Sequence, residues 1–140
     1  MRIVLDTDVI VAAMRSPAGA SAAILKTVDA GQVLMLSSVA LILEYEAQCT
    51  RPAHYEAAGL SQQEAIIFVD AIAALSKPVE LHFFWRPQLR DPGDEMILET
   101  AINGRAQAIV TFNRRDYGQA PTRFGIELLL PAQAIQRIRT

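Results

Sequence analysis

The chain opens with Met1-Arg-Ile-Val-Leu-Asp-Thr-Asp-Val-Ile10, a short aliphatic run that ends in acidic residues. Residues 3–5 are an unbroken aliphatic stretch, which is typical of a strand buried on both faces of a parallel sheet. The run stops at Asp6-Thr7-Asp8, and residues 9–14 resume an apolar pattern that predicts a helix. Open α/β sheets bind their ligands at the carboxyl ends of their strands. The sequence therefore predicts a ligand site around Asp6.

Length and composition indicate one globular domain covering residues 1–140, with 51% hydrophobic and 20% charged residues. The longest apolar stretch, residues 33–43, is broken by two serines and is too short to cross a bilayer, so we expect no membrane association. Cys49 has no second cysteine to pair with, which favours a reducing cytoplasm. The net charge of −2 argues against a general basic coat for nucleic acid.

Apolar runs alternate with helical patterns along the whole chain. We predict strands at 3–5, 33–36, 108–111 and 126–130, and a further short one at 79–81. We predict helices at 21–30 and 39–49, one opened by the capping box Ser61–Glu64, one from Asp91-Pro92 to about Asn103, and a last one from Pro131. Residues 50–60 are interpreted as a connection, and His82-Phe-Phe-Trp85 as aromatic packing in the core or between subunits. This order predicts a three-layer α/β/α fold with a mainly parallel sheet of four to five strands.

Further acidic residues fall where they can join Asp6. Asp94 shares a helical stripe with the apolar positions 97, 98, 101 and 102, so its carboxylate is expected to reach the sheet edge. Glu44 lies on a strongly apolar helix, and Glu46 competes with it because spacing alone does not separate them. Asn113 and Asp116 follow the third long strand at the same edge as Asp6. Carboxylates crowded in this way repel one another unless a cation neutralises them, so the cluster predicts a metal ion.

Together these residues resemble a known family. The order is Asp6-Thr7 after a strand, Ser38 with Glu44 six residues on, Asp94, and then Thr111-x-Asn113-x-x-Asp116. It resembles the PIN-domain nucleases, in particular the bacterial toxin-component group that includes the VapC-type ribonucleases. The resemblance implies a PIN-like fold and a divalent-metal-dependent endoribonuclease, the toxin of a toxin–antitoxin pair. It also implies RNA as substrate, an antitoxin partner and a homodimer.

The resemblance assigns roles to residues of this chain. Asp6, Glu44 and Asp94 would be catalytic, and Asp6, Asp94 and Asp116 would hold Mg²⁺ or Mn²⁺. The chain departs from the family pattern at Asp8, which replaces an asparagine, and at Asn113, which stands at the fourth acidic position and leaves open whether one or two ions bind. The supporting residues are expected to be Thr7, Asp8, Ser38, Thr111 and Asn113, and the phosphate contacts Arg105, Arg114 and Arg115.

Two other functions fit parts of the pattern. A haloacid-dehalogenase-like phosphatase would use Asp6-Thr7-Asp8, Ser37, Lys77 and Gly93-Asp94, but Leu98 stands where its second acid is expected. A PIN-fold module that binds RNA or a partner without cleaving would follow from the neutral Asn113. The phosphatase would form an aspartyl-phosphate at Asp6, and the binding module would keep its cellular effect after Asp6→Ala.

Overall fold

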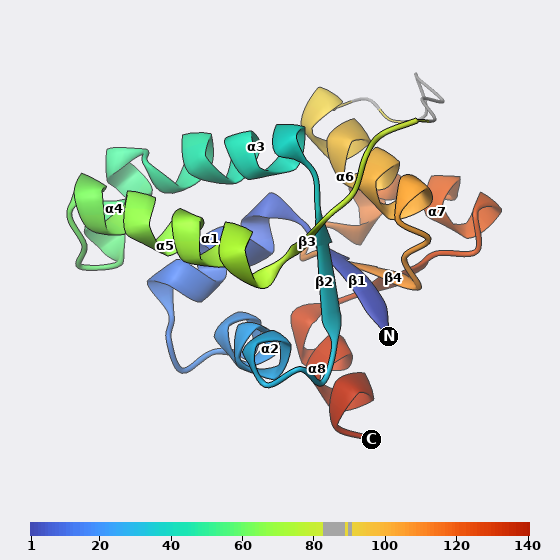
Figure 1. Ribbon diagram of the computed structural model, residues 1–140, viewed down its shortest axis with the longest axis horizontal. Helices are drawn as coiled ribbons and strands as arrows, with labels where there is room; N and C mark the ends of the chain where they lie inside the picture. The colour runs from blue at the N-terminus through green and yellow to red at the C-terminus, as the bar shows by residue number, and fades with distance from the viewer. Residues whose placement is uncertain (83–88, 90) are drawn as a thin grey trace.

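Five parallel strands form the central sheet, in the order β3-β2-β1-β4-β5 (Figure 1). The computed structural model describes residues 1–82, 89 and 91–140. In the central strand β1, Ile3 pairs with Met35 of β2 on one side and with Ala108 of β4 on the other. The aliphatic run 3–5 is fully buried, as predicted. The strands are β1 (Arg2–Leu5), β2 (Leu34–Ser37), β3 (Lys77–Pro78), β4 (Ala108–Val110) and β5 (Glu127–Leu129).

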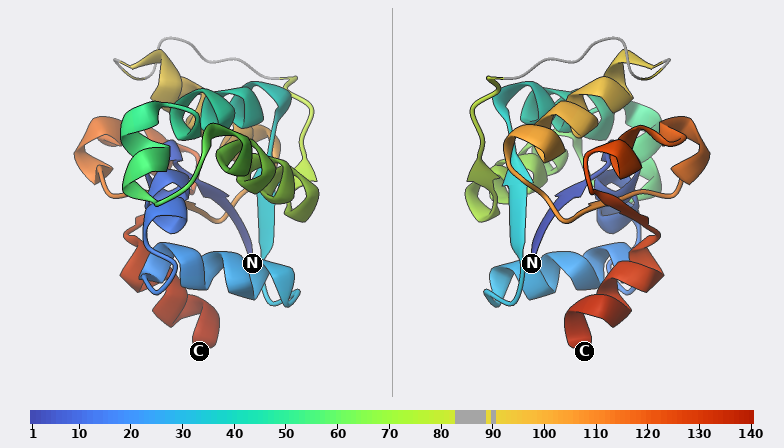
Figure 2. Two further views of the ribbon diagram at one scale, coloured as in Figure 1. Left: turned by 90° about the vertical axis from the view of Figure 1, so that its left-hand side faces the viewer. Right: turned by 90° about the vertical axis from the view of Figure 1, so that its right-hand side faces the viewer.

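Helices cover both faces of the sheet, which confirms the predicted three-layer architecture with a parallel sheet. Helix α6 packs on β1, β2 and β4 and also touches α3. Helices α2 and α8 pack together at the opposite end of the molecule, as Figures 1 and 2 show. The helices are α1 (Thr7–Arg15), α2 (Ala20–Asp29), α3 (Val39–Cys49), α4 (Pro52–Ala57), α5 (Gln62–Leu75), α6 (Pro92–Asn103), α7 (Ala120–Arg123) and α8 (Pro131–Arg139), with a 3₁₀ turn η1 at Arg114–Tyr117.

Side-chain caps fix the helix starts that the sequence predicted. Ser61 and Glu64 form both bonds of the capping box at α5, at 3.0 and 3.1 Å. Asp91 Oδ1 accepts a hydrogen bond from the Gly93 amide at 2.8 Å, so this residue caps α6. Each of these bonds satisfies a backbone amide that the helix itself leaves without a partner. The entry into α6 places Asp94 in its first turn.

The structure departs from the predicted elements in three places. Residues 50–60 contain α4, which buries none of its side chains and so leaves no apolar stripe in the sequence. Strand β3 lies at Lys77–Pro78 and not at 79–81. The sequence did not predict its position because this edge strand is exposed and has no apolar alternation. The short elements η1 and α7 were not predicted either. The aromatic residues 83–85 lie outside the described residues.

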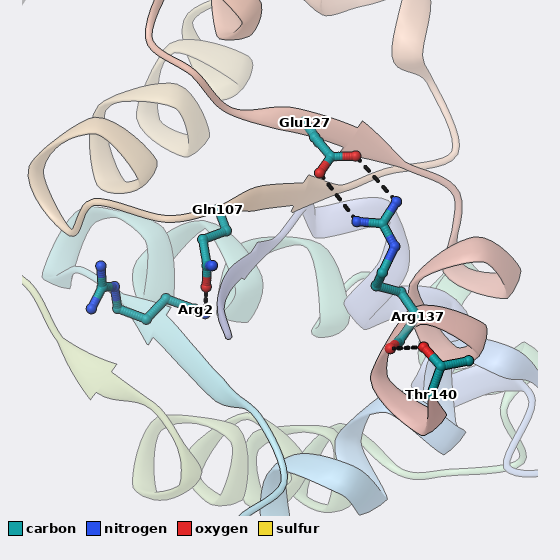
Figure 3. Close-up of polar contacts among 5 residues, drawn as sticks. All are labelled: Arg2, Gln107, Glu127, Arg137 and Thr140. Atoms are coloured by element: carbon teal, nitrogen blue, oxygen red, sulfur yellow. Dashed lines mark hydrogen bonds and ion pairs between the residues drawn. The ribbon is translucent and has the colours of Figure 1, made fainter.

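The amino end of the sheet is held by exposed polar contacts (Figure 3). The Arg2 amide donates to Gln107 Oε1 at 2.8 Å, and the guanidinium of Arg137 on α8 makes two bonds to Glu127 of β5, at 3.1 and 3.2 Å. An ion pair this exposed contributes little to stability, because water and salt screen it. Among the described residues, no single helix is long and apolar enough to cross a membrane; α1 and α2 pass that test only as a pair bent by 98°.

Candidate active site

A pocket of about 610 Å³ lies at the carboxyl end of the sheet. It is lined from α1, α3, α4, the start of α6 and the segment after β4. Glu46 is not part of this lining, so the geometry favours Glu44 over its competitor. The predicted site residues that line the pocket are Asp6, Thr7, Asp8, Glu44, Asp94, Asn113 and Asp116.

Asp6 is held rigidly at the base of the pocket. Its Oδ1 accepts a hydrogen bond from the Thr7 amide at 2.7 Å. Its Oδ2 accepts from the hydroxyls of Thr111 at 2.7 Å and Tyr117 at 2.9 Å. A carboxylate oxygen has two acceptor positions, so Oδ2 is saturated while Oδ1 keeps one. Asp6 can therefore offer Oδ1 to a cation without giving up a hydrogen bond.

Tyr117 is a fixed donor to Asp6. Its side chain is 1% exposed, and burial, followed by the charge of Asp6, holds the pKa of Tyr117 far above its ordinary value. The hydroxyl therefore keeps its proton over the whole working pH range. Burial is also the largest effect on Asp6 and raises its pKa, against the lowering effect of the hydroxyls of Thr111 and Tyr117.

Asp8 has one oxygen with partners and one without. Oδ2 accepts from the Phe112 amide at 3.2 Å and from Asn113 Nδ2 at 2.9 Å. Oδ1 is buried and has no hydrogen-bond partner among the described residues. Burial, and next the charge of Asp6, raises the pKa of Asp8 to about 7. An ionised oxygen in this position is costly unless something outside the chain compensates it.

Asp94 completes the acidic group. Burial raises the pKa of Asp94 to about 7, and the next contributions are the charges of Asp6 and Asp91, followed by Asp116 and Asp8. These carboxylates, from distant parts of the sequence, line the same pocket. The sequence expectation that Asp6 and Asp94 meet is thus met by the geometry.

The donor set fits a hard divalent cation that keeps part of its water shell. The pocket offers carboxylate oxygens, which Mg²⁺ prefers, and Asp8 Oδ1 is a buried oxygen without a partner among the described residues. In the described parts of the chain, no three Asp, Glu, His or Cys side chains are arranged to hold a metal ion by themselves. Mg²⁺ commonly takes only one or two protein carboxylates and several waters, so this arrangement suits it.

Some of the predicted site residues lie outside the pocket. The Ser38 hydroxyl caps α3 and is hydrogen-bonded to Thr100 at 2.8 Å. Thr111 is fully buried behind Asp6 and also accepts from the Asn113 amide at 3.0 Å. Arg115 lines a neighbouring pocket. The two pockets share Asp91, Asp94 and Asp116. Arg114, the residue before Arg115, is exposed. Arg105 lies before β4, at the opposite end of that strand from the acidic group.

The sequence reasoning missed residues on the far wall of the pocket. Arg15, Gln48 and His54 line it from α1, α3 and α4. Arg15 and Gln48 each lie one helical turn beyond a pocket residue, at 12 and 44, and this spacing was the available signal. No such signal existed for His54, because α4 has no apolar stripe. The positioning hydroxyl of Tyr117 was also missed, although this residue directly follows Asp116.

The phosphatase set is not assembled around Asp6. Ser37 is buried and its hydroxyl is hydrogen-bonded to that of Ser76 at 2.7 Å. Lys77 is exposed on β3. Neither residue lines the pocket that contains Asp6 and Asp94. Leu98, at the place of the expected second acid, is buried in the hydrophobic core.

Comparison with known proteins identifies a family and shows the similarity of the fold to a solved structure. A family model described as PIN domain matches residues 2–115. A chain of the crystal structure of VapBC2 from Rickettsia felis, bound to a DNA fragment from their promoter, superimposes with a TM-score of 0.67. That match has 15% sequence identity and covers 91% of this chain and 97% of the other. No protein of the curated set matches the sequence significantly.

Proposed function

The chain belongs to the PIN domain family, a family of nucleases, and from this premise we propose that it is a divalent-metal-dependent endoribonuclease. One observation supports this proposal above the others. Asp6, Asp8, Asp94 and Asp116 lie together in a pocket where the pKa values of Asp8 and Asp94 are raised to about 7. A divalent cation offsets the repulsion of such a group.

We assign the metal to Asp6 and Asp94, with Mg²⁺ or Mn²⁺ as the ion. Asp6 would contribute Oδ1, and the Thr7 amide and the hydroxyls of Thr111 and Tyr117 would keep this carboxylate in one orientation. Asp116, with Asp8, would act through bound water. When bound, the ion supplies a Lewis acid for the phosphodiester and its leaving oxygen. Because Asn113 is neutral, one ion is the simplest stoichiometry.

Glu44 is the group we assign to the attacking water. It is half-buried at the pocket wall, and Gln48 Nε2 donates to its Oε1 at 3.2 Å. This bond restrains the carboxylate from α3, one turn along the same helix. Glu44 would accept the proton of the water as the oxygen attacks phosphorus.

We further propose that the chain is the toxin of a toxin–antitoxin pair. The support is the resemblance to VapC-type proteins and the similarity of its fold to a chain of the VapBC2 structure. An antitoxin would then cover the pocket, the toxin would form a homodimer, and it would act in the cytoplasm. Arg115 and Arg114, beside the acidic group, remain our candidates for RNA phosphates, whereas Arg105 is farther from it.

The neutral Asn113 also keeps the binding-module alternative open. Its amide is engaged with Asp8, so it supports the acidic group without adding charge to it. If the protein only binds RNA or a partner, Asp6→Ala should leave its effect on cell growth unchanged. If it cleaves, Asp6→Ala should abolish that effect.

The direct test is incubation of purified protein with assorted RNAs in Mg²⁺, Mn²⁺ or chelator. We expect cleavage that needs the metal and falls by at least about 100-fold in Asp94→Asn, since even outer partners of a metal site typically matter 10–100-fold. Asp70→Asn is the matched control, because Asp70 is exposed on α5 and lies outside the pocket. Cleavage that persists in chelator, or equally in Asp94→Asn, would rule out the assignment.

A further inference from the structure

The pocket is larger than its acidic end requires. A divalent ion with six waters occupies on the order of 200 Å³, at about 30 Å³ per water. The pocket measures about 610 Å³. On the side of α1, α3 and α4 the lining carries, besides Glu44, the apolar side chains of Val11 and Ala12 and the hydrogen-bonding side chains of Arg15, Gln48 and His54.

Phe112, from the segment after β4, is an exposed aromatic residue on the lining of the same pocket. Six large apolar side chains are exposed among the described residues, and Phe112, at 49%, is the aromatic one. Its backbone amide donates to Asp8 Oδ2, and the next side chain, Asn113, donates to the same oxygen. The ring is therefore anchored through its backbone to the acidic group while much of its surface stays open. Exposed aromatic rings in nucleic-acid sites stack on unpaired bases.

Two other lining residues, on α3 and α4, carry groups that can hydrogen-bond to the edge of a base. Gln48 and His54 line the pocket from α3 and α4. Nδ1 of His54 is buried and, within the described ranges, has no hydrogen-bond partner. The ring nitrogens of a histidine and the side-chain amide of a glutamine can form hydrogen bonds with the donors and acceptors on the edge of a base. Arg15, exposed at the last turn of α1, lines the same part of the pocket and suits a phosphate.

We propose that this region is a nucleobase subsite for single-stranded RNA. The base of a nucleotide next to the scissile phosphate stacks on Phe112, Gln48 and His54 hydrogen-bond its edge, and Arg15 contacts a neighbouring phosphate. The inference rests on the proposed ribonuclease function and adds a residue-level basis for base selectivity.

Binding tests the subsite without requiring cleavage. A fluorescent single-stranded RNA of about 12 nucleotides is titrated in chelator with the wild type, Phe112→Ala, Phe112→Trp and Leu43→Ala. Leu43 is the matched control, since it is an exposed apolar residue on α3 outside this pocket. We expect Phe112→Ala to weaken binding about 10-fold, and Phe112→Trp and Leu43→Ala to stay within about 2-fold of the wild type. Equal binding by Phe112→Ala and Leu43→Ala would overturn the proposal.

Cleavage of a random RNA pool, read by sequencing the fragment ends, tests selectivity. We expect the wild type to prefer particular bases at one position beside the cut, and His54→Ala and Phe112→Ala to lose that preference while still cutting. An unchanged preference in both variants would overturn the subsite but leave the ribonuclease assignment intact. If the wild type cuts no RNA, the proposed function fails, and the binding experiment still decides whether a base is held.

Discussion

Replacing Tyr117 by phenylalanine removes one hydroxyl from behind the acidic group and changes nothing else in shape. The hydroxyl donates to Asp6 Oδ2 at 2.9 Å, and the ring is 1% exposed. Thr111 and the Thr7 amide still hold Asp6 after the change. The variant therefore measures what one donor contributes to orienting and stabilising this carboxylate.

The free energy of unfolding that Tyr117→Phe should lose depends on the charge of Asp6. A hydrogen bond to an ionised carboxylate contributes about 1.5–3 kcal/mol, and one to a neutral carboxyl about 1 kcal/mol. For 140 residues the unfolding entropy is about 0.3 kcal/mol/K, so at alkaline pH Tm should fall by about 5–10 °C. Burial raises the pKa of Asp6 above its ordinary value. The loss should therefore shrink as the pH falls through that raised pKa and Asp6 takes up a proton.

Tyr45→Phe is the matched control for Tyr117→Phe. Tyr45 is also a fully buried tyrosine, but its hydroxyl donates to the backbone carbonyl of Leu5, which carries no charge. Thermal unfolding of both variants without metal, at about pH 8 and at the lowest pH at which the wild type stays folded, separates the two cases. We expect a pH-dependent loss only for Tyr117→Phe, and a fall in kcat/KM of roughly 10–100-fold for that variant alone. Equal losses at both pH values would refute the role assigned to Tyr117.

Three further results are expected. Burial and neighbouring charge raise the pKa values of Asp8 and Asp94 to about 7, so both carboxylates bind protons more tightly in the folded than in the unfolded protein. The metal-free protein should therefore become more stable as the pH falls from about 8 to about 5, as measured by thermal unfolding. Added Mg²⁺ should reverse this trend. Asp8→Asn keeps an acceptor for Asn113 but removes a charge, so calorimetric titration should show Mg²⁺ affinity reduced by roughly 10-fold or more, and an unchanged affinity would contradict the role of Asp8. Gly104→Ala would place a Cβ 2.6 Å from Leu36 Cδ1, a buried side chain, and should lower the free energy of unfolding by about 1–3 kcal/mol in urea titrations.

The fold was predictable where the core leaves a pattern in the sequence. The aliphatic runs of β1 and β4 are buried on both faces, and that of β2 is buried except at Leu34. The caps at Ser61 and Asp91 mark helix starts through local hydrogen bonds. Elements that bury little left no such pattern. Helix α4 has no fully buried side chain and strand β3 is exposed, so neither leaves an apolar pattern in the sequence.

The same division holds for the candidate site. Asp6 and Asp94 could be chosen because each lies at the end of a buried pattern, and the helical stripe directs Asp94 towards the sheet. The sequence could not show whether Glu44 or Glu46 serves the site. The two residues lie on different faces of an apolar helix, and which face turns toward the pocket is decided only when the helix packs. The hydroxyl of Tyr117 lies 111 positions from Asp6 in sequence, and no local pattern predicts such a contact.

The position of β1 in the middle of the sheet has a consequence for the newly made chain. This strand is synthesised first, yet both of its neighbours follow it, β2 from Leu34 and β4 from Ala108. The acidic group draws on positions as far apart as Asp6 and Asp116, so it cannot exist until most of the polypeptide has left the ribosome. Whatever chemistry the pocket performs is thereby withheld until the polypeptide has been made at least as far as Asp116.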